Sequence, residues 1–149
     1  WKIPPKPGAE LALVYCGAVA AEADTAYQQL IGDIPDLGLL SITSPDRLHA
    51  NWLHAKKMRR RQVNGAKSEI EHLLGDLAPA ASLITLIDGH PATLSWLGAV
   101  AGHRIYPLGV EQFGQSGDIN DLYRHYGIDT DAILDAAARA CLCQQLASS

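Results

Sequence analysis

The chain has 149 residues, of which 48% are hydrophobic and 19% charged, and this composition fits one globular domain and excludes a disordered segment. Its formal net charge of −4 excludes a sequence-wide electrostatic attraction to nucleic acid or to an acidic membrane surface. Three cysteines without framework spacing favour a reducing compartment, which we expect to be the cytoplasm, and no apolar run reaches the roughly 18 residues of a membrane span.

The first half of the chain predicts strands that alternate with helices. Residues 1–9 carry prolines at positions 4, 5 and 7 and predict a linker or leader, with an edge strand packed on the domain as the alternative. The continuous apolar run at residues 11–16, LALVYC, predicts a strand that is buried on both faces, and a helix follows Gly17. Residues 37–43 predict a second strand, and Thr43 or Ser44 caps the next helix, with Pro45 at its first position.

The middle of the chain predicts another helix, strand and helix. A short helix begins near Ser68, and we expect Pro79 to end it. The apolar run at residues 82–87, SLITLI, predicts the third strand. Residues 88–91 form a turn, residues 92–100 predict a helix, and Gly102 closes that helix.

The last third predicts a strand, a loop and two helices. The strand begins at Ile105 and gives way to a glycine-rich loop. Ser116 or Asp118 caps the following helix by accepting a backbone N–H, and Gly127 closes it. Asp129 or Thr130 caps the last helix, whose tail from position 144 we expect to fray.

This order of elements predicts the fold class. Parallel neighbours need crossovers of about a dozen residues, which the intervening helices supply, and right-handed crossovers place helices on both faces of the sheet. We therefore predict a three-layer α/β/α domain at residues 10–146, built on a mostly parallel open sheet, with a tail at residues 147–149.

Two loops of the predicted sheet carry the candidate site residues, because open α/β sheets place their sites at the carboxyl ends of strands. Asp88 and His90 follow the third strand, and Glu111, Gln115 and Ser116 follow the fourth. His90 could act as a base or bind an anion, or could cap the next helix locally. Asp88 and Glu111 could form a carboxylate pair, or could serve in turns and caps.

A run of cations at the end of the second predicted helix is the other candidate site. Lys56, Lys57, Arg59, Arg60 and Arg61 fall within six residues. They predict either a patch that binds an anion or partner, or a solvated helix end whose cations favour the negative pole of the helix dipole.

Motifs for catalysis and metal binding are missing from the sequence. The six histidines form no H-x-x-x-H or H-E-x-x-H pair, and the chain holds no G-x-S-x-G, G-x-G-x-x-G or P-loop pattern. We therefore predict no catalytic residue and no metal ligand in this chain.

The fourth strand, its loop and the next helix carry a family resemblance. Residues 109–117, GVEQFGQSG, and residues 121–129, DLYRHYGID, resemble the carboxyl-terminal domain of the transketolase family of thiamine-diphosphate enzymes. That family includes transketolase, deoxyxylulose-phosphate synthase and the decarboxylating component of 2-oxo acid dehydrogenases. Residues 41–48, SITSPDRL, and 83–98, LITLIDGHPATLSWLG, are most similar to the homodimeric pyruvate dehydrogenase branch. Gln112 stands where the family usually has arginine.

The resemblance implies a domain that supports catalysis without performing it. It implies a sheet of about five strands, one of them antiparallel. Family members hold thiamine diphosphate and Mg²⁺ between their other two domains with a G-D-G motif and a later asparagine, and G-D-L at residues 75–77 is not that motif. The chain, which starts at Trp1, would be an inactive fragment of a longer polypeptide with a structural and subunit-assembly role. Its partners would be the other domains of that polypeptide, a second copy in a homodimer and, for a pyruvate dehydrogenase, a lipoyl-carrier acyltransferase.

Two other functions stay open. The chain could be a free-standing flavodoxin-like enzyme or small-ligand-binding domain that uses the strand-end loops at His90, Glu111 and Gln115. It could also be a docking module that uses the basic helix end from Lys56 to Arg61.

Overall fold

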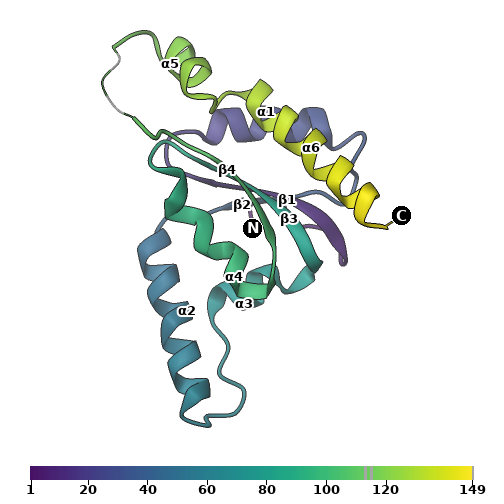
Figure 1. Cartoon of the computed structure of the whole chain (residues 1–149), viewed down its shortest axis with the longest axis vertical. Coiled ribbons are helices and arrows are strands. Elements are labelled where there is room, and N and C mark those ends of the chain that lie inside the picture. The colour runs from purple at the N-terminus through teal and green to yellow at the C-terminus, as the bar shows by residue number, and fades with distance from the viewer. Residues whose placement is uncertain (113, 115, 149) are drawn as a thin grey trace.

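A parallel sheet forms the centre of the molecule in the computed structural model, which describes residues 1–112, 114 and 116–148 (Figure 1). Its strands, in the order β2-β1-β3-β4, are β2 (Gly38–Ser41), β1 (Ala9–Cys16), β3 (Leu77–Ile87) and β4 (Arg104–Leu108). All three neighbouring pairs are parallel. The expected open parallel sheet is therefore confirmed.

The two central strands, β1 and β3, divide the core in two. Side chains alternate across a strand, so Leu11, Leu13 and Tyr15 face one core while Ala12 and Val14 face the other. Both sets are buried, which explains why these strands read as continuous apolar runs in the sequence.

Helices cover both faces of the sheet and complete the three layers (Figure 1). One face carries α1 (Ala20–Leu30) and α6 (Thr130–Ser148), and α5 (Ile119–Tyr126) precedes α6. The other carries α2 (Pro45–Arg60), α3 (Glu69–Leu73), and two 3₁₀ helices, η1 (Leu74–Asp76) and η2 (Pro91–Leu97), with α4 (Gly98–Ala101) continuing from η2. None of the described helices is long and apolar enough to cross a membrane.

Several element boundaries differ from the predicted ones. Pro79 does not end a helix, because α3 and η1 finish earlier and β3 already begins at Leu77. The first part of β3 is irregular: Ala80 has a left-handed φ of 58°, and the pairing with β1 shifts register between Ala9 and Leu11. This irregularity lets a strand continue through a proline.

The two ends of the domain are also more ordered than expected. Ala9, assigned to the linker, opens β1, and α6 extends to Ser148, beyond the predicted domain end at residue 146. The tail does not fray at Gln144, whose Nε2 donates to the backbone oxygen of Glu10 at 2.6 Å.

Within the described part of the chain the sheet has four strands, not the five that the resemblance implied. An antiparallel contact does occur at its β2 edge, as an isolated bridge in which Ile3 and Leu39 exchange backbone hydrogen bonds of 3.1 and 2.9 Å. Pro4 and Pro5 follow at once and have no N–H to extend the pairing. The indole Nε1 of Trp1 donates to the carbonyl of Leu73 at 2.8 Å, so the leader packs on the domain.

Candidate functional site

The loops after β1 and β3 meet at the carboxyl edge of the sheet through Asp88. Its exposed carboxylate accepts a hydrogen bond from the backbone N–H of Ala18 at 3.1 Å. Gly17 lies against the same carboxylate with a φ of 90°, and a side chain there would overlap it. Asp88 therefore ties two strand-end loops together, and the structure shows no contact between it and Glu111.

His90 is the N-cap of η2. Its Nδ1 accepts a hydrogen bond from the backbone N–H of Ala92 at 3.2 Å, so this nitrogen is occupied locally. Pro91 is at the first helical position, where its missing N–H removes no hydrogen bond from the helix. The structure thus places His90 in the local cap that was the alternative to a base or anion ligand.

The loops after β3 and β4 are in direct backbone contact. The N–H of Val110 donates to the carbonyl oxygen of Gly89 at 2.8 Å. A Cβ on Gly109 would lie 2.6 Å from that oxygen and 2.8 Å from the nitrogen of Pro91, so only glycine fits. This approach fixes the position of the Glu111 loop at the edge of the sheet.

A pocket of about 600 Å³ opens beside this contact, between the end of β4 and the end of α5. Glu111 lines it, whereas Asp88 and His90 do not. The sequence reasoning missed two of its lining residues, His125 and Tyr126, whose rings meet edge to face at 5.1 Å. In the sequence they are marked only by their place just before Gly127, which ends α5 in a left-handed conformation with a φ of 64°.

Ser116, another predicted residue of this loop, does not line the pocket. Ser116 is exposed, and the N-cap of α5 is Asp118, whose Oδ1 accepts the N–H of Ile119 at 3.0 Å. Gln115 lies outside the described residues. A carboxylate and an imidazole in one pocket can bind a polar ligand through hydrogen bonds.

The residues that the structure describes lack the G-D-G motif with which the resembling family holds its metal and diphosphate. They hold no group of three or more histidine, cysteine, aspartate or glutamate side chains that could bind a metal ion. Gly75 and Asp76 of the G-D-L sequence form η1, and the Asp76 carbonyl accepts from the backbone of Gly8.

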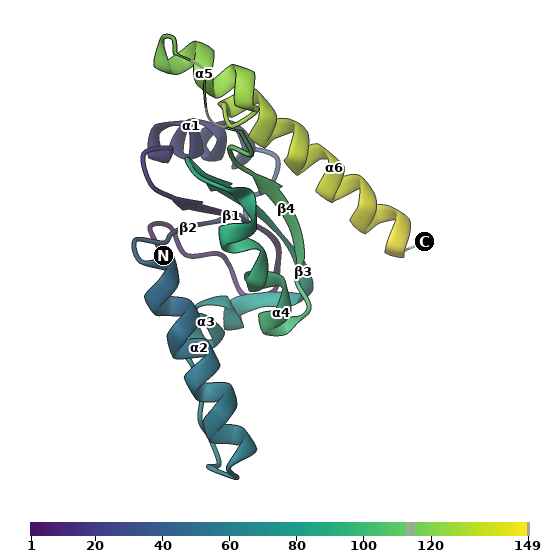
Figure 2. The same ribbon diagram turned by 60° about the vertical axis from the view of Figure 1, so that its left-hand side comes forward.

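The predicted basic patch lies on a projecting hairpin formed by α2, the loop after it and α3 (Figure 2). We call residues 53–67, the far half of α2 and its loop, the basic arm. Lys57, Arg60 and Arg61 are exposed, and Lys56 lies over the ring of Trp52 at 4.4 Å.

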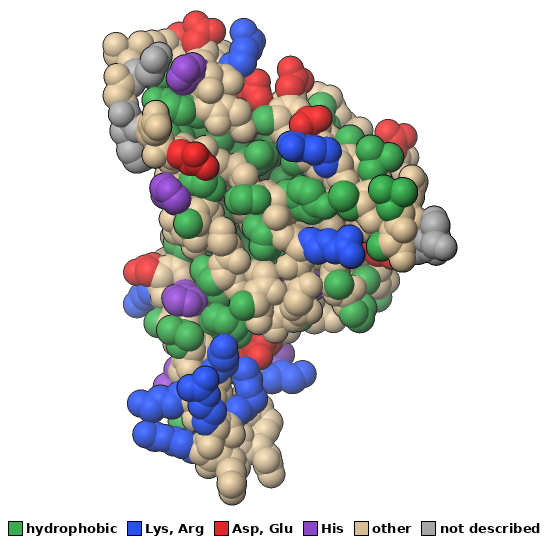
Figure 3. All heavy atoms as spheres, in the orientation of Figure 1, with side chains coloured by type: hydrophobic (Ala, Val, Ile, Leu, Met, Phe, Trp, Pro, Cys, Tyr) green, Lys and Arg blue, Asp and Glu red, His purple; other side chains and the backbone are tan. Residues whose placement is uncertain are grey.

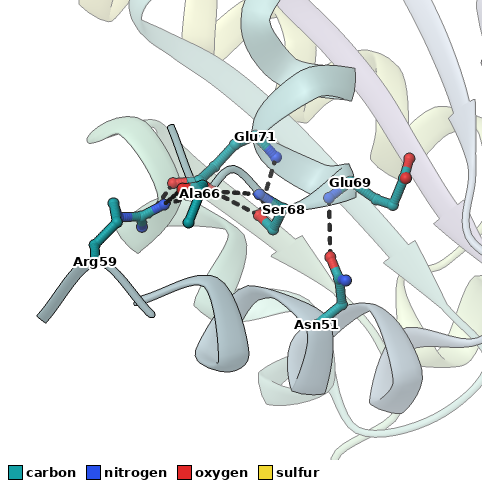
Figure 4. A network of polar contacts seen from close by, with 6 residues as sticks. All are labelled: Asn51, Arg59, Ala66, Ser68, Glu69 and Glu71. Atoms are coloured by element: carbon teal, nitrogen blue, oxygen red, sulfur yellow. Dashed lines mark hydrogen bonds and ion pairs between the residues drawn. The ribbon is translucent and has the colours of Figure 1, made fainter. Parts of the chain in front are cut away.

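A polar network holds the arm against α3 (Figure 4). Arg59 pairs with Glu71 at 2.9 Å and donates to the carbonyl of Ala66 at 2.7 Å. Ser68 and Glu71 form a reciprocal capping box at the start of α3, and Asn51 accepts the N–H of Glu69 at 2.9 Å. Partial burial would raise the pKa of the Glu71 carboxyl, but hydrogen bonds from Arg59 and Ser68 outweigh it and lower the pKa.

The network gives a first prediction, for Glu71→Gln. At pH 7 this change should lower the free energy of unfolding by about 1–2 kcal/mol, because an amide cannot replace the charged acceptor of Arg59 and Ser68. The lowered pKa means that the carboxylate stabilises the fold above its ordinary pKa of 4.5 and loses that effect as the pH falls through the folded-state value. Denaturant titrations should therefore converge for the two proteins in acid. Glu69→Gln, at an exposed side chain, is the matched control, and an equal loss in both variants would contradict the prediction.

Comparison with known proteins supports the fold. No protein-family profile and no curated protein matches the chain. Among solved structures, nineteen chains match. One is described as a split-gene transketolase, an inactive β4 tetramer, and has a TM-score of 0.61 at 16% sequence identity. The match covers 91% of this chain and 40% of that one, so this chain spans less than half of its solved neighbour. At this identity the likeness concerns fold alone, and the chain has the α/β fold of a transketolase carboxyl-terminal domain.

Proposed function

We propose that this chain is the carboxyl-terminal domain of a thiamine-diphosphate-dependent enzyme, with a structural and subunit-assembly role and no cofactor site of its own. One observation carries the proposal: 91% of the chain superposes on 40% of a split-gene transketolase chain. The parent would act in the cytoplasm and cleave a carbon–carbon bond next to a carbonyl. Within the family, the segments SITSPDRL and LITLIDGHPATLSWLG favour a pyruvate dehydrogenase parent.

The parent's thiamine diphosphate and Mg²⁺ would be held by its other domains. The G-D-L segment does not have the G-D-G pattern of such a site, and its Gly75 and Asp76 lie in η1, which supports a cofactor site in the other domains. Partners of the chain would be those domains, a second copy in a homodimer and, for a pyruvate dehydrogenase, a lipoyl-carrier acyltransferase. The solved neighbour is a tetramer by its description, which supports a role in assembly.

Calorimetric titration tests the absence of a cofactor site. Thiamine diphosphate added to the chain with Mg²⁺ should give no saturable heat, because the sequence has no G-D-G motif and the described residues hold no group of three or more histidine, cysteine, aspartate or glutamate side chains. A polypeptide that carries a G-D-G…N segment is the positive control. Saturable cofactor binding by the isolated chain would overturn the proposal.

A second experiment tests the assembly role. The coding sequence upstream of Trp1, or an adjacent reading frame, should encode the G-D-G…N segment. Co-expressed with that polypeptide, the chain should co-purify in one complex, and its removal should dissociate the catalytic subunits in sedimentation. Catalytic subunits that assemble equally well without the chain would contradict this role.

The pocket at the carboxyl edge favours one alternative, a small-ligand-binding domain or enzyme. Its volume of about 600 Å³ falls within the range of small-molecule sites, and Glu111 and His125 supply polar groups. A ligand that raises the melting temperature of the wild-type chain, but not of Glu111→Gln, would favour this function over the assembly domain.

A further inference from the structure

A second pocket opens at the carboxyl end of β2 and is lined by different residues from the Glu111 pocket. Its volume is about 400 Å³, within the range of small-molecule sites. Residues of β2, of the first two turns of α2 and of α3 line it. Among them Leu40 and Ile42 are buried, and Leu48 and Leu73 are half-buried. Part of the wall is therefore apolar and can accept an apolar group of a ligand.

The same pocket carries one cation and one carboxylate. Arg47 and Glu69 both line it, and both residues are exposed. No ion pair joins either of them to another of the described residues, and Arg59 pairs with Glu71 instead. In Figure 4 the Glu69 carboxylate points away from the network around Arg59. Both charges are therefore available to a ligand.

Asn51 sets the relative position of the two charged residues. It follows Arg47 at i+4, so these two side chains share one face of α2, with Cβ atoms about 5–6 Å apart. Its Oδ1 accepts the backbone N–H of Glu69 at 2.9 Å, which holds the start of α3 beside that face. The cation and the carboxylate thus come from two elements whose supports are one helical turn apart. This spacing suits a small ligand that carries both charges close together.

Two further polar groups of the pocket are not used by the described part of the fold. Ser44 is the N-cap of α2, yet its side chain makes no capping hydrogen bond. The Oδ1 of Asn51 is occupied by Glu69, whereas its Nδ2 donates to none of the described residues. A hydroxyl and an amide N–H can both donate to a carboxylate, so these groups can assist Arg47.

We propose that this pocket binds a free α-amino acid with an apolar side chain. Arg47 would bind the carboxylate of the ligand, and Glu69 would bind its ammonium group. The apolar side chain would lie against Leu40 and Ile42. A free amino acid presents the two opposite charges and the apolar group within one small molecule, which is the combination that lines the pocket.

A phosphorylated ligand is favoured less by the same residues. Figure 3 shows Lys and Arg side chains gathered at the lower end of the molecule, on the basic arm, which holds six of the twelve cations of the chain. Arg47 lies outside the arm and is the one Lys or Arg among the described residues that line the pocket. Glu69 would repel a phosphate dianion but attracts an ammonium group. The proposal does not depend on the proposed function, and cofactor calorimetry leaves it unchanged.

Nuclear magnetic resonance titration of the isotope-labelled whole chain with L-leucine tests the proposal. The backbone amide signals of Ile42, Ser44 and Glu69 should shift and saturate, with a dissociation constant below about 10 mM. Leucinamide lacks the carboxylate and N-acetyl-leucine lacks the ammonium group. Each should bind at least about ten-fold more weakly, because each leaves one charged side chain without its partner.

Two substitutions assign the charges to their residues. In Arg47→Gln, L-leucine should lose its advantage over leucinamide, and in Glu69→Gln it should lose its advantage over N-acetyl-leucine. Arg61→Gln and Glu111→Gln are the matched controls, at exposed residues that do not line this pocket. Both should bind L-leucine within about two-fold of the wild-type chain, and circular dichroism of each variant verifies folding.

Several results would overturn the proposal. One is the absence of saturable shifts with L-leucine and L-phenylalanine up to about 10 mM. Another is equal binding of L-leucine, leucinamide and N-acetyl-leucine by the wild-type chain. Loss of binding in Glu111→Gln but not in Glu69→Gln would locate the ligand in the other pocket. Shifts with inorganic phosphate that Arg47→Gln abolishes, while L-leucine gives none, would show an anion site instead.

Discussion

Gly109→Ala is expected to lower the free energy of unfolding by about 3 kcal/mol, the upper part of the usual range for overpacking. The new methyl group would lie 2.6 Å from the carbonyl oxygen of Gly89 and within 3 Å of the Pro91 backbone. These atoms belong to the main chain and cannot rotate away as a side chain can. Relief requires the two strand-end loops to separate, which also breaks the hydrogen bond from Val110 to Gly89.

Denaturant unfolding followed by circular dichroism measures this loss. Gly32→Ala is the matched control, because a Cβ there meets no atom within 4 Å and the backbone has no positive φ. It should be neutral or slightly stabilising, since alanine restricts the unfolded chain. Equal midpoints for Gly109→Ala and the wild-type protein would show that the loops are not in the contact described.

His103→Leu should have the second largest effect, and it should stabilise the protein increasingly in acid. His103 is only 6% exposed, and neither ring nitrogen has a hydrogen-bond partner among the described residues. Burial lowers the pKa of its imidazole below 6.5. The backbone of Ala81 lies near enough to oppose this shift in part, but not in a geometry that satisfies a ring nitrogen. Leucine removes the buried polar nitrogens, which cost about 1–3 kcal/mol when unsatisfied.

The pH dependence follows from the direction of that shift. Above pH 6.5 the ring is neutral in both states, so its pKa difference costs nothing. As the pH falls below 6.5, the unfolded chain takes up a proton while the folded chain resists it, and the wild-type protein loses stability until the pH reaches the folded-state pKa. The stability curves of wild type and His103→Leu should therefore diverge as the pH falls below 6.5. Parallel curves, or the same divergence in a control at the exposed His54, would contradict this account.

The sheet was predictable because its central strands are buried on both faces. The apolar runs in β1 and β3 have no polar alternation, and a parallel sheet between helices is the architecture that buries such runs. Two helix ends were predictable from glycine positions, because helices often end at a glycine in the left-handed conformation. Gly102 and Gly127 both have such φ values.

The features that the sequence did not predict depend on contacts between distant segments. Ala80 adopts a left-handed conformation that no propensity suggests, and β3 continues past Pro79 for that reason. The partner of Asp88 is Ala18, seventy residues away, and the pocket is lined both by Glu111, from the loop after β4, and by His125, from α5. Periodicity carries no information about such pairings.

The strand order also determines how this chain must fold. The central pair joins Leu11 to Ser82, so β1 leaves the ribosome long before its main partner exists. Until β3 is synthesised, β1 has one unpaired edge and two apolar faces. Only β2 and nearby helices can then shield these from solvent. Such long-range pairing makes folding slow and leaves time for aggregation. We therefore expect refolding yields to fall steeply with protein concentration and to improve with a chaperone that binds unfolded chains.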